Sequence, residues 1–255
     1  MSHLDYVILA IAGALAGALN ALAGGGSFIT IPALMFTGSS PILSNTNSTI
    51  ATWPGIVSTY FSYRKRLTGS SHPLGLYAAM ALIGAALGAV LLLMTSNEFF
   101  VALLPWLLLI ATLLLIFGNR ITAWAMGTDH KDGATLPKGI SYTLLFIIAV
   151  YGGYFGGGMG IMTLAVFTVM GMRDMHEMNA LKILWTCMIN GVAVVIFLAT
   201  GKVEWLRCLT MMAGAIAGGY VTGHFAQYIP KLWLRRFVIT IAVGMTAYYF
   251  IRGWV

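Results

Sequence analysis

Four polar side chains in one apolar stretch have the types and spacing to bind a small anion. Asn179, Lys182, Thr186 and Asn190 follow one another at intervals of three, four and four residues, which places all four on one face of a helix. Lys182 would supply a full positive charge, and an ionisable residue in such a stretch is by default a candidate for a functional site. The alternative is that Lys182 extends its long side chain toward water and has no part in binding.

Two runs of three glycines interrupt the apolar pattern elsewhere. A glycine lowers helix stability by roughly 1 kcal/mol relative to alanine, and non-helical backbone persists in a membrane only where it is buried in protein or lines a cavity. Backbone N–H groups and helix N-termini at such breaks bind anions. The predicted substrate contacts at the two breaks are Gly24, Gly25, Gly26 and Ser27 in the first and Gly156, Gly157 and Gly158 in the second.

The residues that follow each glycine run also correspond. Asn47 stands six residues before Trp53, and Asn179 stands six residues before Trp185. We interpret this as two copies of one structural unit, and we predict that Asn47, its neighbour Thr46, and Asn179 contact the substrate. The alternatives are interhelical hydrogen bonds or helix caps for the asparagines. Trp53 and Trp185 are secondary candidates, for which helix packing is the alternative.

Asn20 and His176 complete the candidate set. Asn20 is the strongly polar residue near the end of the first apolar run, and His176 stands at the mouth of the stretch that carries Lys182. His176 could carry a coupling proton, because histidine titrates near neutral pH. A solvated loop histidine is the alternative.

The sequence carries no recognisable catalytic or metal-binding set. Its seven Asp and Glu residues lie in or next to predicted loops. It has neither a Ser/His/Asp arrangement, nor a phosphate-binding Walker pattern, nor Cys and His residues at metal-ligand spacing. Cys187 and Cys208 both fall in apolar segments and are interpreted as small buried hydrophobes. We therefore expect no enzymatic activity, no cofactor and no metal ion.

Composition indicates an all-α polytopic membrane protein. Of the 255 residues, 59% are hydrophobic and 8% are charged, against roughly a quarter charged in soluble domains. Apolar runs of about 20 residues, the length at which a helix crosses a bilayer, recur through the chain. The net charge of +7 comes from basic residues in loops, which is typical of topology signals rather than of nucleic-acid binding.

The apolar runs predict about 8–10 membrane segments in two repeats. We assign residues 1–118 to the first repeat, 119–138 to a cytoplasmic linker and 139–255 to the second repeat. The segments are expected at about 4–22, 28–37, 44–63, 73–94 and 99–117, and again at 139–155, 161–170, 176–200, 205–227 and 232–251. The second segment of each repeat is too short to span comfortably. This short segment and the segment before it either form a re-entrant hairpin with the glycines at its tip, or both cross the membrane.

Basic loops set the expected orientation. Arg64–Arg66 place the loop before residue 73 in the cytoplasm. In the second repeat, Lys231, Arg235 and Arg236 place the loop between the last two segments in the cytoplasm. The loop before residue 205, which is equivalent to the loop before residue 73, therefore lies outside. Equivalent loops on opposite sides define an inverted repeat. Many secondary transporters have this arrangement, and they bind substrate near the membrane midplane where broken helices meet.

The doubled pattern resembles the sulfite exporter TauE/SafE family over essentially the whole chain. The residues that carry the resemblance are Ala14–Gly17, Gly24–Ser27, Pro32, Gly152, Gly153, Gly156–Gly158 and the turn Gly201–Trp205. The second repeat departs from the first by having Leu164 and Ala165 in place of Pro32, so the two half-sites need not be equivalent. The resemblance implies a transporter in the cytoplasmic membrane for small sulfur-containing anions such as sulfite, sulfoacetate and related sulfonates.

The leading hypothesis is therefore a secondary transporter that exports such an anion by alternating access, as a multi-pass protein of the inner membrane. The alternative is a channel-like permease for a small anion or another small solute. The expected partners are the small anion and the lipid bilayer, and no nucleic acid. A coupling ion, either a proton or sodium, and a homodimeric assembly are both compatible with this class.

The inverted arrangement predicts that the Arg64–Arg66 loop and the Lys202–Arg207 segment face opposite sides of the membrane. Single cysteines at Arg64 and at Lys202, in a background without Cys187 and Cys208, should show this by labelling with an impermeant maleimide from outside. We expect only the cysteine at Lys202 to react in intact cells. Labelling of both positions, or of neither, would contradict the inverted assignment.

Overall fold

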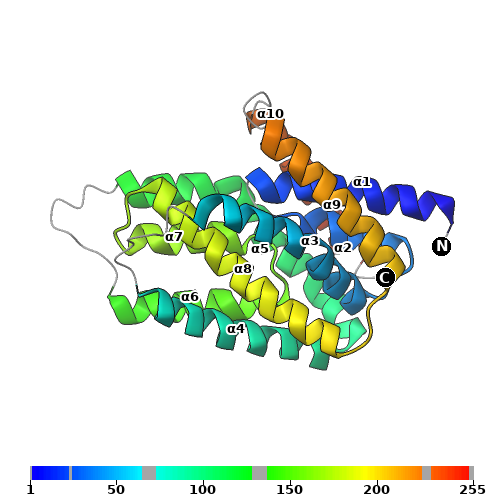
Figure 1. Ribbon diagram of the computed structural model, residues 1–255, viewed down its shortest axis with the longest axis horizontal. Helices are drawn as coiled ribbons and strands as arrows, with labels where there is room; N and C mark the ends of the chain where they lie inside the picture. The colour runs from blue at the N-terminus through cyan, green and yellow to red at the C-terminus, as the bar shows by residue number, and fades with distance from the viewer. Residues whose placement is uncertain (1, 23–24, 65–72, 128–136, 226–230, 253–255) are drawn as a thin grey trace.

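The chain folds as a bundle of helices, as its composition predicts. The computed structural model describes residues 2–22, 25–64, 73–127, 137–225 and 231–252, and those residues form ten helices (Figure 1). In chain order they are α1 (His3–Leu22), α2 (Ser27–Phe36), α3 (Pro41–Tyr63), α4 (Leu74–Met94), α5 (Asn97–Gly127), α6 (Lys138–Tyr154), α7 (Met159–Val169), α8 (Met175–Ala199), α9 (Trp205–Phe225) and α10 (Lys231–Arg252). The predicted all-α class is confirmed.

The helix boundaries agree with the predicted segments to within a few residues, with one exception. α5 continues to Gly127, past its predicted end at about residue 117, so the first part of the predicted linker 119–138 is helical. A fall in hydropathy marks the point at which a chain leaves lipid, whereas a helix can continue into water. Residues 128–136 lie outside the described part of the chain.

Several helices are long and apolar enough to cross a membrane. Among the described residues these stretches are His3–Asn20, Leu74–Met94, Asn97–Gly118 and His176–Ala199, and shorter apolar helices occupy Ser27–Phe36, Met159–Val169 and Ile239–Ile251. Large hydrophobic side chains also face outward, and those on α4 include Leu82, Ile83, Leu87, Val90 and Leu91. Such a surface is stable against lipid rather than water. The chain is a multi-pass membrane protein, as predicted.

Helices of the first half pack closely against helices of the second half. α1 packs along α9, and α4 packs along α6 (Figure 1). A Cβ atom at Gly17 would lie 2.0 Å from the carbonyl oxygen of Ala215, and one at Gly88 would lie 2.0 Å from that of Val150. Glycines four residues apart permit this approach of two backbones in lipid. The pairs so spaced are Gly13 and Gly17, Gly84 and Gly88, and Gly214 and Gly218.

These contacts follow the predicted repeat. α6 is the counterpart of α1, and α9 is the counterpart of α4, so the pair α1–α9 in one half corresponds to the pair α6–α4 in the other. The equivalent helices α3 and α8 run in opposite directions in Figure 1. Asn47, near the start of α3, accordingly bonds to Glu204, which follows the end of α8. This packing is compatible with an inverted repeat; the repeat itself and the sidedness of each half in the membrane stay predictions.

Each glycine break turns the chain back on itself. α2 begins against α1, where Gly26 packs on Ala16 and Asn20. Thr37, just past the end of α2, then reaches Arg207 in the first turn of α9. Because α9 runs beside α1 in the same direction, α2 returns toward the end at which α1 begins. With 10 residues in α2 and 11 in α7, neither helix reaches the ~20 residues of a full span. The structure therefore favours the hairpin over two full crossings.

Filling the helix contact should destabilise the protein. In Gly88→Leu the new side chain would meet the backbone of α6 at Val150, and we expect a loss of at least about 1–3 kcal/mol, as in other overpacked interiors. Thermal unfolding of the purified protein in detergent measures this loss. Gly75→Leu is the matched control, because it lies in the same helix and a Cβ there meets nothing within 4 Å. Equal melting temperatures for the two variants would show that the close approach does not stabilise the fold.

Candidate functional site

The first glycine break is held by a side chain of α1. The backbone N–H of Gly26 donates to Oδ1 of Asn20 at 2.9 Å, and a Cβ at Gly26 would lie 2.8 Å from Nδ2 of the same asparagine. Gly25 has a φ of 107°, which strongly favours glycine. Ser27, half-buried, begins α2, and Gly24 lies outside the described residues. Asn20 therefore shapes the break, and a contact with substrate at these residues stays a prediction.

Polar residues of α2 and α3 meet directly behind this break. The hydroxyl of Thr30 donates to the carbonyl oxygen of Gly26 at 3.1 Å and lies 2.5 Å from the hydroxyl of Ser48. Thr46 donates back to the carbonyl oxygen of Ile42 in its own helix at 2.9 Å. Thr30, Thr46 and Ser48 are all almost fully buried. Satisfied polar groups at such depth join helices strongly, because breaking one bond leaves a costly unpaired group.

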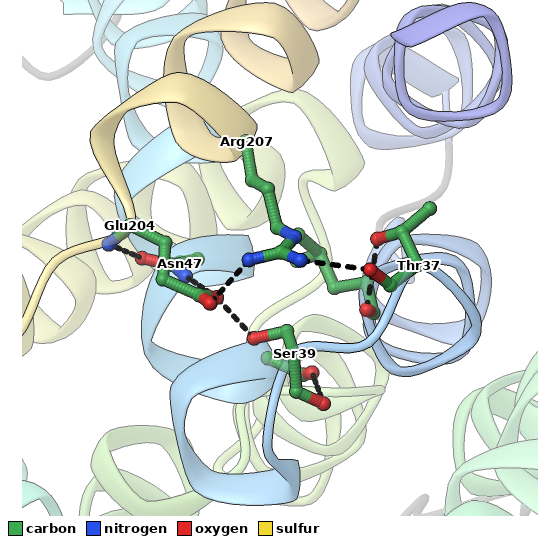
Figure 2. Close-up of polar contacts among 7 residues, drawn as sticks. Thr37, Ser39, Asn47, Glu204 and Arg207 are labelled. Carbon is green, nitrogen blue, oxygen red and sulfur yellow. Dashed lines mark hydrogen bonds and ion pairs between the residues drawn. The ribbon is translucent and has the colours of Figure 1, made fainter. Parts of the chain in front are cut away.

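Asn47 joins the two halves of the protein through Glu204 (Figure 2). Its Nδ2 donates to Oε2 of Glu204 at 2.9 Å, and its Oδ1 accepts from the backbone N–H of Glu204 at 3.3 Å. Ser39, in the turn between α2 and α3, donates to the same carboxylate oxygen. Both ends of the Asn47 amide are thus engaged with the residue that immediately precedes α9.

Arg207 completes this cluster from the first turn of α9. Its guanidinium donates to Oε1 of Glu204 and, at 2.8 Å, to the carbonyl oxygen of Thr37 (Figure 2). Glu204 and Arg207 keep 24% and 19% of their side-chain surface exposed, so water still reaches the ion pair. We call Thr37, Ser39, Asn47, Glu204 and Arg207 the Glu204 cluster.

The second glycine break lies between asparagines of two other helices. Asn45 of α3 donates through Nδ2 to the carbonyl oxygen of Tyr154, the last residue of α6, at 2.7 Å. Asn190 of α8 donates to the carbonyl oxygen of Thr186 at 3.0 Å, and its Oδ1 lies 3.9 Å from the position of a Cβ at Gly156. The break therefore lies at a contact between the first and the second half of the chain.

The backbone of this break is held from within its own hairpin. The Tyr151 hydroxyl donates to the carbonyl oxygen of Gly157 at 2.7 Å. Gly158 precedes α7 in the left-handed conformation, with a φ of 77°, and a Cβ there would lie 3.2 Å from that of Ala111 in α5. The predicted glycines are thus required by the turn itself, and anion binding at them remains a prediction.

Lys182 lies on α8 beside the first turn of α7. A Cβ at Gly160 would lie 3.4 Å from Cδ of Lys182, so the aliphatic part of the lysine covers this glycine. Nζ donates to Oδ1 of Asn179 at 3.1 Å. An anion at this position would meet the full charge of Lys182 and the positive end of the α7 dipole.

The remaining candidates make structural contacts, although the indole N–H of Trp185 is buried without a hydrogen-bond partner in the described structure. Trp53 donates through Nε1 to the carbonyl oxygen of Cys187 at 3.1 Å. Trp185 is almost fully buried and stands edge-to-face with Tyr77 at 6.2 Å between ring centroids. His176 is exposed, and its backbone N–H is capped by Asp174 at 2.7 Å. These contacts are those of the packing and solvated alternatives, and they do not test a role in transport.

The two predicted asparagines do not converge in this structure. Asn47 bonds beyond the far end of α8, whereas Asn179 lies near its start, about 30 Å away along the helix at 1.5 Å per residue. One small anion cannot contact both residues at once in this conformation. Lys182, Asn179 and the start of α7, by contrast, lie together.

Sequence reasoning missed three residues of these sites. Asn45 belongs to the polar run before Asn47 but is not among the predicted site residues, and its Oδ1 is buried without a hydrogen-bond partner in the described structure. Glu204 lies just before the predicted segment 205–227 and Arg207 near its start, and neither is among the predicted site residues. The turn Gly201–Trp205, which carries part of the family resemblance, was the available signal for them.

The described residues also bear on metal binding. Among them, no three His, Cys, Asp or Glu side chains lie close enough to hold a metal ion. The donors gathered at the glycine breaks are amides, hydroxyls, backbone groups and one lysine, which suit the binding of an anion.

The known proteins that match the chain are named as membrane transporters. A family profile described as "Sulfite exporter TauE/SafE" matches residues 9–249. A "Probable membrane transporter protein" of Haemophilus influenzae is 27% identical over 254 residues, which cover 97% of this chain and 95% of the relative. One from Sinorhizobium is 27% identical over 248 residues, covering 96% and 93%. YfcA of Escherichia coli K12, with a similar name, is 24% identical over 251 residues, covering 97% and 90%. No solved structure matches the chain significantly.

The first glycine break should not tolerate a side chain. Gly25→Ala would force an L residue into a left-handed conformation at a cost of roughly 1–2 kcal/mol, and we expect a lower melting temperature and impaired transport. Gly55→Ala, in α3, is the control, because a Cβ there meets nothing within 4 Å. It should leave the melting temperature unchanged or raise it. If Gly25→Ala behaves like Gly55→Ala, the break does not depend on this backbone conformation.

Proposed function

Because the chain belongs to the sulfite exporter TauE/SafE family of membrane transporters, we propose that it is a secondary transporter that exports a small sulfur-containing or organic anion. Sulfite, sulfoacetate and related sulfonates are the proposed substrates. The protein would move them across the cell membrane by alternating access of its two halves. A coupling proton or sodium ion and a homodimer remain expectations for such a transporter.

The position of Lys182 carries the proposal. It places one ammonium group on a membrane-spanning helix beside a glycine break, within reach of a helix N-terminus. A sulfonate or sulfite offers several oxygens with delocalised negative charge, which suit an ammonium and backbone N–H donors together. Asn179, Thr186 and Asn190 share the helix face of Lys182 and would supply further hydrogen bonds.

The packing of α1 on α9 and of α4 on α6 supports alternating access rather than a channel-like permease. When two hairpins enter a bundle from opposite ends, each can adopt the conformation that the other had before. The two resulting states open the site to opposite sides of the membrane. A channel needs no such interchange. Accumulation of the anion against an opposing gradient in proteoliposomes would distinguish the transporter from the permease.

Lys182→Met should weaken anion binding. The substitution keeps the aliphatic chain over Gly160 and removes the charge, so we expect a loss of about 1–3 kcal/mol, typical of charge-assisted hydrogen bonds. Lys182→Arg should recover part of the affinity, because the guanidinium keeps the charge but has a different shape. Titration calorimetry with sulfite and sulfoacetate measures the dissociation constants.

Lys138→Met is the matched control for lost charge, because Lys138 is exposed at the start of α6. It should leave the dissociation constants unaltered. A lysine that only extends toward water predicts the same for Lys182→Met. Unchanged affinity in that variant, at equal amounts of folded protein, would remove Lys182 from the site. Binding of uncharged solutes alone would rule out an anion transporter.

A further inference from the structure

We propose that the Glu204 cluster is a gate, which closes the path between the two halves at the end where α3 and α9 begin and which opens during transport. In this assignment Asn47 and Ser39 hold the gate shut and are not ligands of the substrate. The inference rests on the proposed alternating access and assigns the residues that separate.

The hydrogen bonds of the cluster cross between the halves. Glu204 accepts from Ser39 and Asn47 of the first half, and its own N–H donates to Asn47. Arg207 donates across the same boundary to the carbonyl oxygen of Thr37. These bonds join the start of α9 to the α2–α3 turn and to α3, so they must break if α9 and α3 separate at this end.

The cluster covers buried groups at the interface. The Cys208 thiol, one residue beyond Arg207, is fully buried and donates to the carbonyl oxygen of Asn47 at 3.7 Å. Asn45, two residues before Asn47 in the chain, lies against the end of α6 at the second glycine break. The cluster therefore covers the buried thiol of Cys208 and lies on the same part of α3 as the contact to the second break.

The exposure of the ion pair suits a gate. Glu204 and Arg207 are paired but remain about one quarter and one fifth exposed. Breaking a fully buried ion pair would strand charges in a medium of low dielectric constant. Partly exposed charges regain water as they separate, so the energy gained by pairing is modest and the link can open and close.

Cys208 reports the state of the gate directly. In a Cys187→Ala background, a small charged thiosulfonate reagent should modify Cys208 slowly while the gate is shut. Glu204→Gln keeps the shape of the side chain and removes its charge, which weakens the bonds from Arg207, Ser39 and Asn47. We expect modification to become roughly tenfold faster, as loss of a charge-assisted hydrogen bond implies.

Asn47→Asp gives an independent test with nearly the same shape. It places a second carboxylate where Nδ2 now donates to Glu204 at 2.9 Å, so repulsion should open the gate and again speed modification. Glu98→Gln is the matched control, because Glu98 is exposed at the start of α5, and it should leave the rate unaltered. Thermal unfolding and gel filtration verify that each variant is folded.

Sidedness separates a gate from general loosening. In right-side-out and inside-out vesicles, the faster modification should occur only from the side that carries the α8–α9 connection. An equal increase from both sides, or an unchanged rate in both folded variants, would overturn the proposal. No substrate is needed, so the gate can stand even if none of the proposed anions is transported, and a failed gate leaves the anion-binding test of Lys182 intact.

Discussion

The close approach of α1 to α9 and of α4 to α6 is the constraint on which the rest of the structure depends. At these crossings a glycine stands where any Cβ would overlap backbone, as at Gly17 and Gly88. In lipid there is little hydrophobic gain from helix association, so contact between backbones has to hold the bundle together. Each crossing joins one repeat to the other. The glycine-broken hairpins, carried on α1 and α6, are therefore positioned by the opposite half of the chain.

Polar groups in the bundle are organised around that constraint in two different ways. At the first break, Asn20 and Thr30 bond within the hairpin and its neighbour α3, and so they fix local shape. Glu204 and Asn45 instead bond across the repeat boundary. A group of the first kind can stay satisfied while the halves move, whereas a group of the second kind has to exchange its partner. The first break is thus held within its own half, whereas the second is tied to the other half through Asn45.

The helices were predictable from sequence, and the site only in part. Apolar runs and glycine triplets located the short helix α2 to within a residue or two, because membrane helices are defined by local hydropathy. Lys182 and Asn179 were predicted as neighbours, since helix geometry sets residues three apart on one face. The bond between Asn47 and Glu204 joins residues 157 apart, and no local rule selects which distant loop an asparagine meets. The end of α5 was placed too early because hydropathy ends before the helix does.

The packing of α1 against α9 also has a consequence for the synthesis and membrane insertion of the protein. α1 leaves the ribosome before α9, against which its glycine face packs. α9 begins roughly 180 residues later, a delay of roughly 10–40 s at ordinary rates of synthesis. During that time α1 and its hairpin have no native partner for the surface formed by Gly13 and Gly17. The nascent first half is thus an unfinished assembly in the bilayer. It depends on surrounding lipid, or on the insertion machinery, to protect that face until the second half arrives.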